Sequence, residues 1–148
     1  MLYRNGNAVV LEFNTKGIEN RRVGRNRQLV LETLGRSPAP MSAYQILDEL
    51  KCEGLQAPLQ VYRALDQLIR ERRVHKIESL SAFTLCTHDD DSDHRVVVFT
   101  ICEKCRQTSE VHAPKVTEIL DAIAGGQQLR MSSATVELTG LCETCDNG

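Results

Sequence analysis

Aromatic side chains and long apolar runs are both scarce in this sequence of 148 residues. Tryptophan is absent, and aromatic residues make up 4% of the chain. The longest unbroken apolar runs, such as Val96–Phe99, are far too short to cross a bilayer. The N-terminal segment carries one charge before a short apolar patch, and no cleavage pattern of small residues follows it. The sequence therefore predicts a soluble, cytoplasmic protein.

Catalytic signatures are missing as well. A catalytic zinc needs an open coordination position and a nearby acid or base, as in the H-x-E…P-C-x-x-C pattern of deaminases. No H-x-E occurs in the chain. We therefore expect no enzyme. A metal-buffering or protein-interaction module is the alternative to a DNA-binding protein.

The net charge of −2 conceals an asymmetry along the chain. Residues 1–86 carry 13 Lys and Arg against 9 Asp and Glu, whereas residues 87–148 carry 5 against 11. A basic first part joined to an acidic second part indicates that only the first part meets a polyanion such as DNA.

Residues 24–86 carry the signals of three helices followed by a hairpin. Leu29, Val30 and Leu34 form a narrow apolar stripe, and Ser42 is a good N-cap for the helix after it. Helices joined by a tight turn and followed by a hairpin make a winged helix-turn-helix. The expected elements are the helices Asn26–Leu34 and Ala43–Lys51, a helix within Ala57–Arg73, and the strands Arg73–Glu78 and Ala82–Cys86.

The helix within Ala57–Arg73 has two distinct sides. Pro58 is suited to the first helical position, where its missing N–H costs nothing. One side is an apolar stripe with Arg72 at its end; it contains Val61, Ala64, Leu65, Leu68 and Ile69. The other side presents long hydrogen-bonding side chains that can reach base edges and phosphates, namely Gln60, Arg63, Gln67 and Arg70. An ordinary solvated face is the alternative interpretation.

The acidic, polar segment Thr87–Asp93 indicates a hinge, which we place at residues 87–95. A β-β-α-β pattern follows, and a unit of only ~55 residues usually needs a metal, a disulfide or a partner subunit. The expected fold is α+β, with a winged-helix domain in residues 1–86, of which 1–23 form an arm of uncertain structure, and a small α/β domain in residues 96–148. The expected elements of the second domain are the strands Val96–Ile101 and Gln107–His112, the helix Pro114–Ala124 with Val116, Ile119, Leu120 and Ile123 on one face, and the strand Arg130–Leu138.

Two C-x-x-C pairs predict a structural zinc site. Each pair directly follows an expected strand, and four thiolates satisfy tetrahedral zinc with no open position for water. A redox pair is the alternative, but a single C-x-x-C would serve that chemistry. The four ligands expected are Cys102, Cys105, Cys142 and Cys145.

A second metal site is suggested by residues on both sides of the hinge. His75 begins the hairpin and Cys86 ends it, so the two can lie close together. Sulfur, imidazole and carboxylate ligands together suit zinc better than magnesium, calcium or manganese. Taken singly, each histidine is more often an ordinary surface residue. The candidate set is His75, Cys86, His94 and Glu110, with His88 and His112 as alternative ligands.

Several motifs resemble the Fur family of metal-dependent repressors, and within it the zinc uptake regulators. These motifs are Ser42–Asp48 (S-A-Y-Q-I-L-D), Val61–Asp66 (V-Y-R-A-L-D), Val74–Ser79 (V-H-K-I-E-S) and the two C-x-x-C pairs, and the resemblance covers about Gly24 to Cys145. The sequence departs from the family pattern in three places: at Gln60, where Thr is usual, at Gly24–Arg27, where T-P-Q-R is common, and in one extra residue between His94 and Cys102.

The resemblance implies a homodimer that binds double-stranded operator DNA through the winged helix and dimerises through the C-terminal domain. It implies a zinc-responsive repressor controlling zinc-uptake genes, with two zincs per chain: a structural one and a regulatory one held by His75, Cys86, His94 and Glu110. An iron- or peroxide-sensing regulator is the alternative. Arg25, Arg27, Arg72, Arg73 and Lys76 are expected at phosphates, and the other DNA-binding residues expected are Gln60, Tyr62, Arg63, Gln67, Arg70 and Tyr44.

Overall fold

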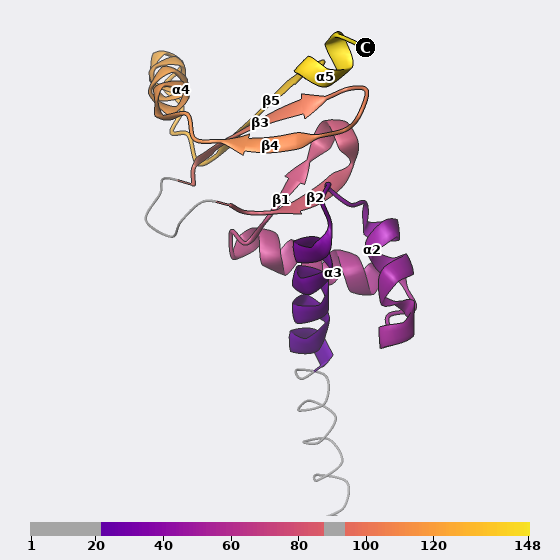
Figure 1. Ribbon diagram of the computed structural model, residues 1–148. Coiled ribbons are helices and arrows are strands. Elements are labelled where there is room, and N and C mark those ends of the chain that lie inside the picture. The colour runs from indigo at the N-terminus through magenta and orange to yellow at the C-terminus, as the bar shows by residue number, and fades with distance from the viewer. Residues whose placement is uncertain (1–21, 88–93) are drawn as a thin grey trace, which may run out of the picture.

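The computed structural model describes residues 22–87 and 94–148, and it shows helices, a hairpin and a three-stranded sheet stacked in that order (Figure 1). The arm at 1–21, His88 and the acidic run Asp89–Asp93, on which the sequence raised expectations, lie outside these residues. Within the described ranges, no helix has both the length and the apolar character needed to cross a membrane.

Three helices begin the described chain. Within the described residues the first covers 22–36, so it includes the four residues before the expected start at Asn26. The second, α2 (Ala43–Leu50), starts with a capping box: the Gln45 N–H donates to Ser42 Oγ at 3.2 Å, and the Ser42 N–H donates to Gln45 Oε1 at 2.8 Å. A short turn, η1 (Lys51–Glu53), ends at Gly54 with φ 97°, a left-handed conformation that favours glycine. The chain then enters α3.

The third helix, α3 (Pro58–Arg70), begins at the expected proline and ends three residues before Arg73. Its buried side joins the core of the helical domain, through Val61, Ala64, Leu65 and Leu68. Arg72 has left the helix with φ 58° and is exposed, so its expected place on the apolar stripe was wrong. The helix stops there because a left-handed residue cannot continue its hydrogen-bond ladder.

A two-stranded antiparallel wing follows α3. It consists of β1 (Val74–Ile77), the short turn η2 (Glu78–Leu80) and β2 (Ala82–Leu85), with Val74 opposite Leu85 and Ile77 opposite Ala82. Met41 extends the wing by one bridge, since its N–H and C=O exchange hydrogen bonds with Phe83. The winged-helix prediction is therefore confirmed.

The C-terminal part is a three-stranded sheet in the order β4-β3-β5. The strand β3 (Val96–Cys102) pairs antiparallel with β4 (Thr108–Val111) and parallel with β5 (Ala134–Gly140). A parallel return needs a crossover, which α4 (Pro114–Gly126) provides. One turn of helix, α5 (Glu143–Asp146), ends the chain and was not expected from the sequence. The β-β-α-β order is as expected.

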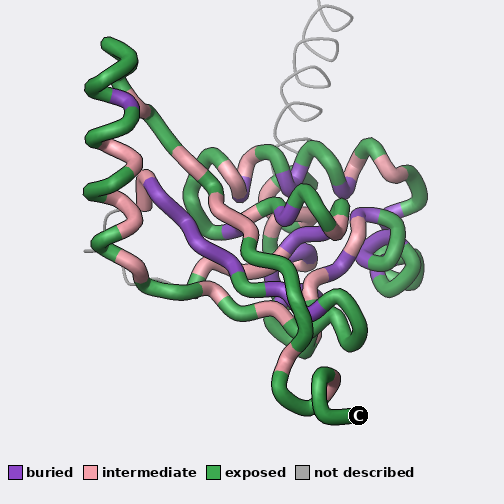
Figure 2. Tube along the Cα trace, turned by 90° about the horizontal axis from the view of Figure 1, so that it is seen from above, coloured by how far each residue is buried: buried purple, intermediate pink, exposed green. Residues whose placement is uncertain are grey.

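The apolar side of α4 is only partly covered by the described residues of this chain. Only Ala124 is buried, and Ile119 and Ile123 are each 59% exposed. Figure 2 shows α4 as a mostly exposed helix beside the buried strand β3. Periodicity located this apolar face but not what covers it.

The wing packs on one face of the sheet. Ile77 of β1 and Leu80 of η2 contact a buried cluster on β3 formed by Val97, Phe99 and Ile101. Residues spaced two apart on a strand share a face, so this side of β3 meets the wing. The metal-binding candidates lie around this contact and at the far end of the sheet.

Candidate metal centres and nucleic-acid interface

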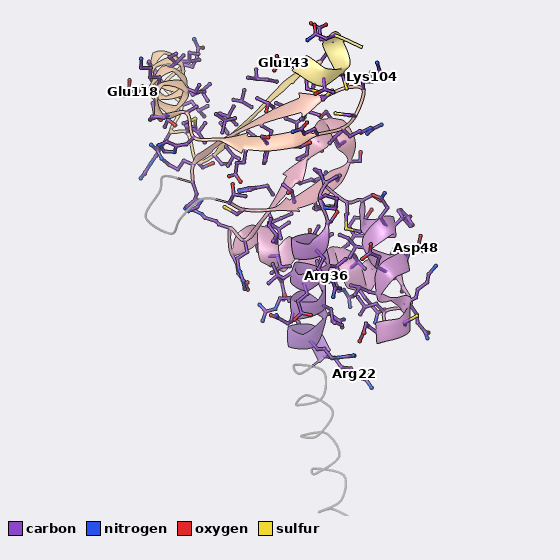
Figure 3. The ribbon with its side chains drawn as sticks, in the orientation of Figure 1. Arg22, Arg36, Asp48, Lys104, Glu118 and Glu143 are labelled. Atoms are coloured by element: carbon purple, nitrogen blue, oxygen red, sulfur yellow. The ribbon has the colours of Figure 1, made fainter. Side chains whose placement is uncertain are left out.

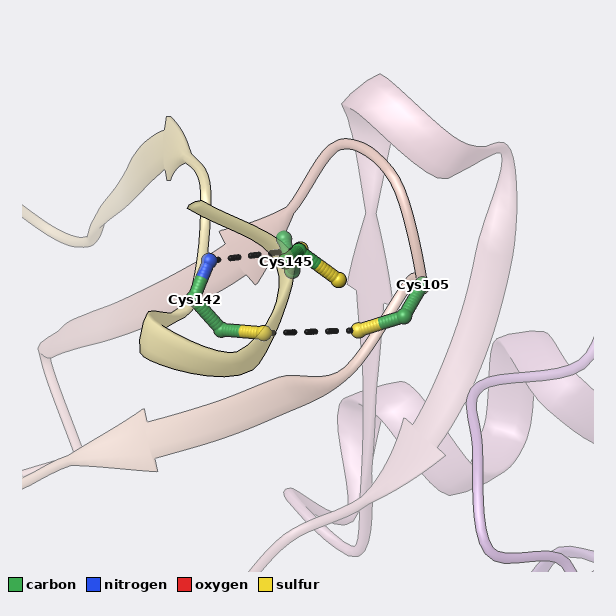
Figure 4. Close-up of side chains that lie close together, drawn as sticks. Cys105, Cys142 and Cys145 are labelled. Carbon is green, nitrogen blue, oxygen red and sulfur yellow. Dashed lines mark hydrogen bonds between the residues drawn. The ribbon is translucent and has the colours of Figure 1, made fainter. Parts of the chain in front are cut away.

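The four cysteines of the two C-x-x-C pairs gather at one end of the sheet. Their sulfurs all lie within 4.8 Å of one another. Cys105 Sγ lies 3.8 Å from Cys142 Sγ, and the Cys142 N–H donates to Cys102 Sγ at 3.4 Å (Figure 4). Tetrahedral zinc with Zn–S bonds of ~2.3 Å would separate its sulfurs by ~3.8 Å. The cluster therefore has the dimensions of a closed Cys₄ zinc site.

The pKa values of two of these thiols also indicate that a cation belongs there. Hydrogen bonds from the backbone N–H groups of Cys105 and Cys142 lower the pKa of Cys102 to about 6. The pKa of Cys145 is raised to about 12, first by its hydrogen bond with Cys142 and then by burial and the neighbouring sulfurs. Four adjacent sulfurs cannot all ionise at neutral pH without a positive charge between them, and zinc supplies one.

A second cluster brings together His75 of β1, Cys86 after β2, and Glu110 of β4. Their ligand atoms lie within 4.8 Å of one another, and His75 Nε2 lies 3.3 Å from Glu110 Oε1. Zinc bonds of ~2.0–2.1 Å to nitrogen and oxygen predict a separation of ~3.3 Å in a tetrahedral site. His75 Nε2 is buried and makes no hydrogen bond of good geometry with the described residues. A buried ring nitrogen of this kind is suited to bind a metal.

Glu110 is held in its charged form. Burial raises its pKa, but the close His75 ring and the hydrogen bonds from Thr87 outweigh that effect and bring the pKa down to about 2. The backbone N–H and Oγ1 of Thr87 each donate to Glu110 Oε2 at 2.9 Å. This leaves Oε1 facing His75. The sequence did not point to Thr87, because no local pattern marks a residue that orients another ligand.

The remaining candidate ligands differ in position. His94 Nδ1 lies 3.8 Å from Cys86 Sγ, although His94 is not in the set whose atoms are all within 4.8 Å of one another. His88 lies outside the described residues. His112 is exposed and belongs to neither cluster found in the described part of the chain. The geometry thus favours His94 over His112 as a fourth ligand.

The side of α3 that faces away from the core carries the residues expected to contact DNA. Tyr62 is 41% exposed, and Arg63 and Arg70 are also exposed. Tyr44 of α2 is 62% exposed. Leu59, in the first turn of α3, is 57% exposed and was not singled out from the sequence, because it interrupts a polar face. Thus α2 exposes an aromatic side chain, and α3 exposes aromatic and cationic ones.

Two of the residues expected to contact DNA, Gln60 and Gln67, differ in how far the fold already engages them. The Oε1 atom of Gln60 accepts hydrogen bonds from the N–H groups of Gln56, at 2.9 Å, and Ala57, at 3.1 Å. Gln60 therefore caps the start of α3, where the family usually has Thr. Gln67 is half-buried, and its Oε1 has no hydrogen-bond partner among the described residues. Their contacts to DNA stay predictions.

The expected phosphate contacts also engage carboxylates within the chain. Arg25 donates to the backbone oxygen of Glu53 at 3.0 Å and to its carboxylate at 3.2 Å, and Arg27 pairs with Glu71. Exposed ion pairs of this kind contribute little and exchange easily. Charged side chains lie along the surface of both halves, as the labelled Arg22 and Glu118 in Figure 3 illustrate.

The chain is similar to known proteins in both sequence and structure. The model of the Ferric uptake regulator family matches residues 18–139. The zinc uptake regulation protein of Escherichia coli K12 is 35% identical over 127 residues, which make up 85% of this chain and 74% of that protein. A holo XcZur crystal structure is 36% identical with a TM-score of 0.75, covering 83% of this chain and 85% of that one. A zinc uptake regulator in complex with zinc and DNA is 28% identical with a TM-score of 0.78, covering 97% and 96%.

Proposed function

The chain belongs to the Ferric uptake regulator family, and we propose that it is a zinc-responsive transcriptional repressor that binds operator DNA as a homodimer. The observation that carries the proposal is the cluster of His75, Cys86 and Glu110. It draws its members from the wing, the end of the wing and the sheet, so a metal bound there would link the DNA-binding part to the dimerisation part.

Two zincs per chain fit this arrangement. The structural ion would be held by the four cysteines at the end of the sheet. The regulatory ion would be held by His75, Cys86, His94 and Glu110, and a thiolate among the ligands favours zinc over harder cations. Both sites would be closed by four protein ligands, so neither offers a position for a reacting water. No catalytic role is proposed.

Regulation follows from which elements the second site joins. When its ligands are all engaged, the wing and β4 are held in one arrangement, which fixes the position of α3 relative to the sheet. Without that restraint, DNA binding must itself order the two domains, which lowers the affinity. Zinc would therefore raise the affinity for DNA, and DNA would raise the affinity for zinc by the same factor.

The uncovered apolar surface of the second domain fits a second copy of the chain. Exposed apolar surface of this kind marks an interaction site when it is large; the exposed apolar side chains of this domain are Val111, Ile119, Ile123, Leu129, Leu138 and Leu141. A symmetric dimer would bury them and present two α3 helices to two half-sites of an operator. The proposed role implies a cytoplasmic location, where operator DNA is accessible.

Metal analysis of the purified protein tests the assignment of zinc. Protein purified without added metal should contain two zincs per chain. The variant Cys86→Ser should contain one, while Cys52→Ser, which removes an exposed thiol outside both clusters, should keep two. One zinc together with one iron in the wild type would instead favour the iron- or peroxide-sensing alternative.

A further inference from the structure

Two carboxylates of the sheet, those of Glu110 and Glu137, flank Phe99 on the face that the wing covers. Phe99 in the central strand β3 pairs with Glu110 of β4 on one side and with Glu137 of β5 on the other. Residues directly opposite one another in neighbouring strands project from the same face of a sheet. Glu110, Phe99 and Glu137 therefore form one row across the face that the wing covers.

The wing contacts all three members of this row. His75 lies against Glu110, and Ile77, two residues further along β1, packs in the cluster that contains Phe99. At the other side, the N–H groups of Glu78 and Ser79 donate to the two carboxylate oxygens of Glu137 at 2.6 and 3.0 Å. The wing thus crosses the sheet from the metal cluster at one side to Glu137 at the other.

The contact at Glu137 is built for a carboxylate. Hydrogen bonds to an ionised acceptor are about twice as strong as neutral ones, and two N–H groups fit its two oxygens. Partial burial opposes ionisation, but the hydrogen bonds from Ser79 and Glu78 hold the pKa of Glu137 below its ordinary value. The neighbouring Glu78 carboxylate is paired with Lys76 Nζ at 2.9 Å, which reduces its repulsion of Glu137.

We propose that Glu137 is a positioning residue that anchors the tip of the wing to the sheet independently of metal. Because the tip of the wing is already held by Glu137, zinc has to restrict the motion of only the part of the wing that carries His75. The wing then loses less conformational entropy when the regulatory ion binds, so the anchor increases the affinity of the second site for zinc. This inference rests on the proposed function only for its effect on zinc and DNA; the anchor itself is a property of the fold.

Amide hydrogen exchange of the full-length homodimer tests the anchor directly. The wild-type amides of Glu78 and Ser79 should be protected in protein loaded with both zincs and in protein stripped only at the second site. Glu137→Gln should increase their exchange in both forms, because glutamine offers one acceptor oxygen where the carboxylate offers two. His75→Ala should leave their protection in place. Unchanged exchange in Glu137→Gln, or loss of protection in His75→Ala, would overturn the proposal.

A zinc titration tests the consequence for regulation. The probe is a duplex selected from a random pool by the zinc-loaded wild type, and the readout is the free zinc concentration at half-maximal DNA binding. In Glu137→Gln this concentration should rise on the order of three- to tenfold, from the loss of one charge-assisted contact. Glu118→Gln, which removes an exposed carboxylate of α4 (Figure 3), should not change it.

The outcomes of the two experiments are separable. A midpoint that is the same in Glu137→Gln and the wild type would refute the regulatory part of the proposal. If the wild type itself bound DNA equally with and without zinc, the proposed function would fail, while the exchange experiment would still decide whether Glu137 anchors the wing.

Discussion

Arg63 is the side chain on which sequence-specific readout should depend most. It is exposed on α3 next to Tyr62, and an arginine can bind the O6 and N7 atoms of guanine with two hydrogen bonds. We predict that Arg63→Ala lowers discrimination between the selected operator and a scrambled duplex by about 1–3 kcal/mol. Fluorescence anisotropy at fixed salt measures both affinities.

Arg130→Ala is the control for Arg63→Ala, since it removes the same charge from an exposed position in the C-terminal part. It should leave the discrimination unchanged. Arg63 has no direct role in readout if its replacement weakens binding to both duplexes by the same factor.

Thr87 should tune the regulatory site without binding the metal. Its hydroxyl and its N–H orient Glu110, and removal of such an orienting contact costs roughly 10- to 100-fold in metal affinity. Thr87→Val keeps the shape and the N–H but removes the hydroxyl, so zinc affinity at the second site should fall by about tenfold. Competition with a chromophoric chelator measures it. Thr100→Val, an exposed position on β3, should match the wild type.

The Cys102 thiol gives the structural site a specific pH dependence. Because its pKa is about 6, it binds a proton below that pH and is ionised above it. Zinc binding to the four cysteines should therefore release one more proton per ion at pH 5 than at pH 7. Calorimetry in buffers of different ionisation enthalpy counts these protons. An equal count at both pH values would contradict the lowered pKa, and Cys52→Ser should not alter the count.

At the scale of elements, α4 tests the proposed dimer. Ile119 is 59% exposed, so a charge there should not disturb the fold of one chain, but it would be buried unpaired in a dimer. Ile119→Glu should shift the protein to a monomer in sedimentation equilibrium while its circular dichroism spectrum stays unchanged. Ile119→Met keeps an apolar side chain of similar volume and should remain dimeric. A dimer that persists in Ile119→Glu would place the interface elsewhere.

The elements themselves were largely predictable because their signals are local. The capping box at Ser42 and Gln45 and the proline at the start of α3 identified two helices, and the spacing within each C-x-x-C pair marked the four cysteines as ligands. Across the wing, Val74 pairs with Leu85, which places His75 near Cys86 as a hairpin requires. Local patterns thus gave the winged helix, the β-β-α-β order, the four cysteines and the pair His75 and Cys86, whereas His94 and Glu110 were chosen by residue type and by the family resemblance.

Features that depend on how elements pack against each other were not predictable. Thr87 and Glu137 acquire their roles only because the wing crosses one face of the sheet, and no spacing in the sequence encodes that crossing. Periodicity showed an apolar side of α4, but the described part of the chain leaves Ile119 and Ile123 exposed on it. Arg72 matched the helical period, yet the helix had already ended.

At the scale of the whole molecule, the proposed regulation depends on coupling between zinc and DNA. The basic helical part and the acidic sheet part meet at the wing, and the second cluster lies at that junction. A site at a junction can favour one arrangement of two domains over others, which is what a metal-dependent switch requires. The four-cysteine cluster lies within the second domain and would hold zinc whether or not the second site is occupied.

Operator binding at clamped free zinc tests this coupling most directly. Wild-type protein and His75→Ala, both holding the structural zinc, would be titrated onto the selected duplex over a range of free zinc. We predict that the wild-type affinity rises by roughly 5- to 150-fold as the second site fills, whereas His75→Ala stays weak throughout. Equal affinity of the wild type with its second site empty and filled would contradict the account.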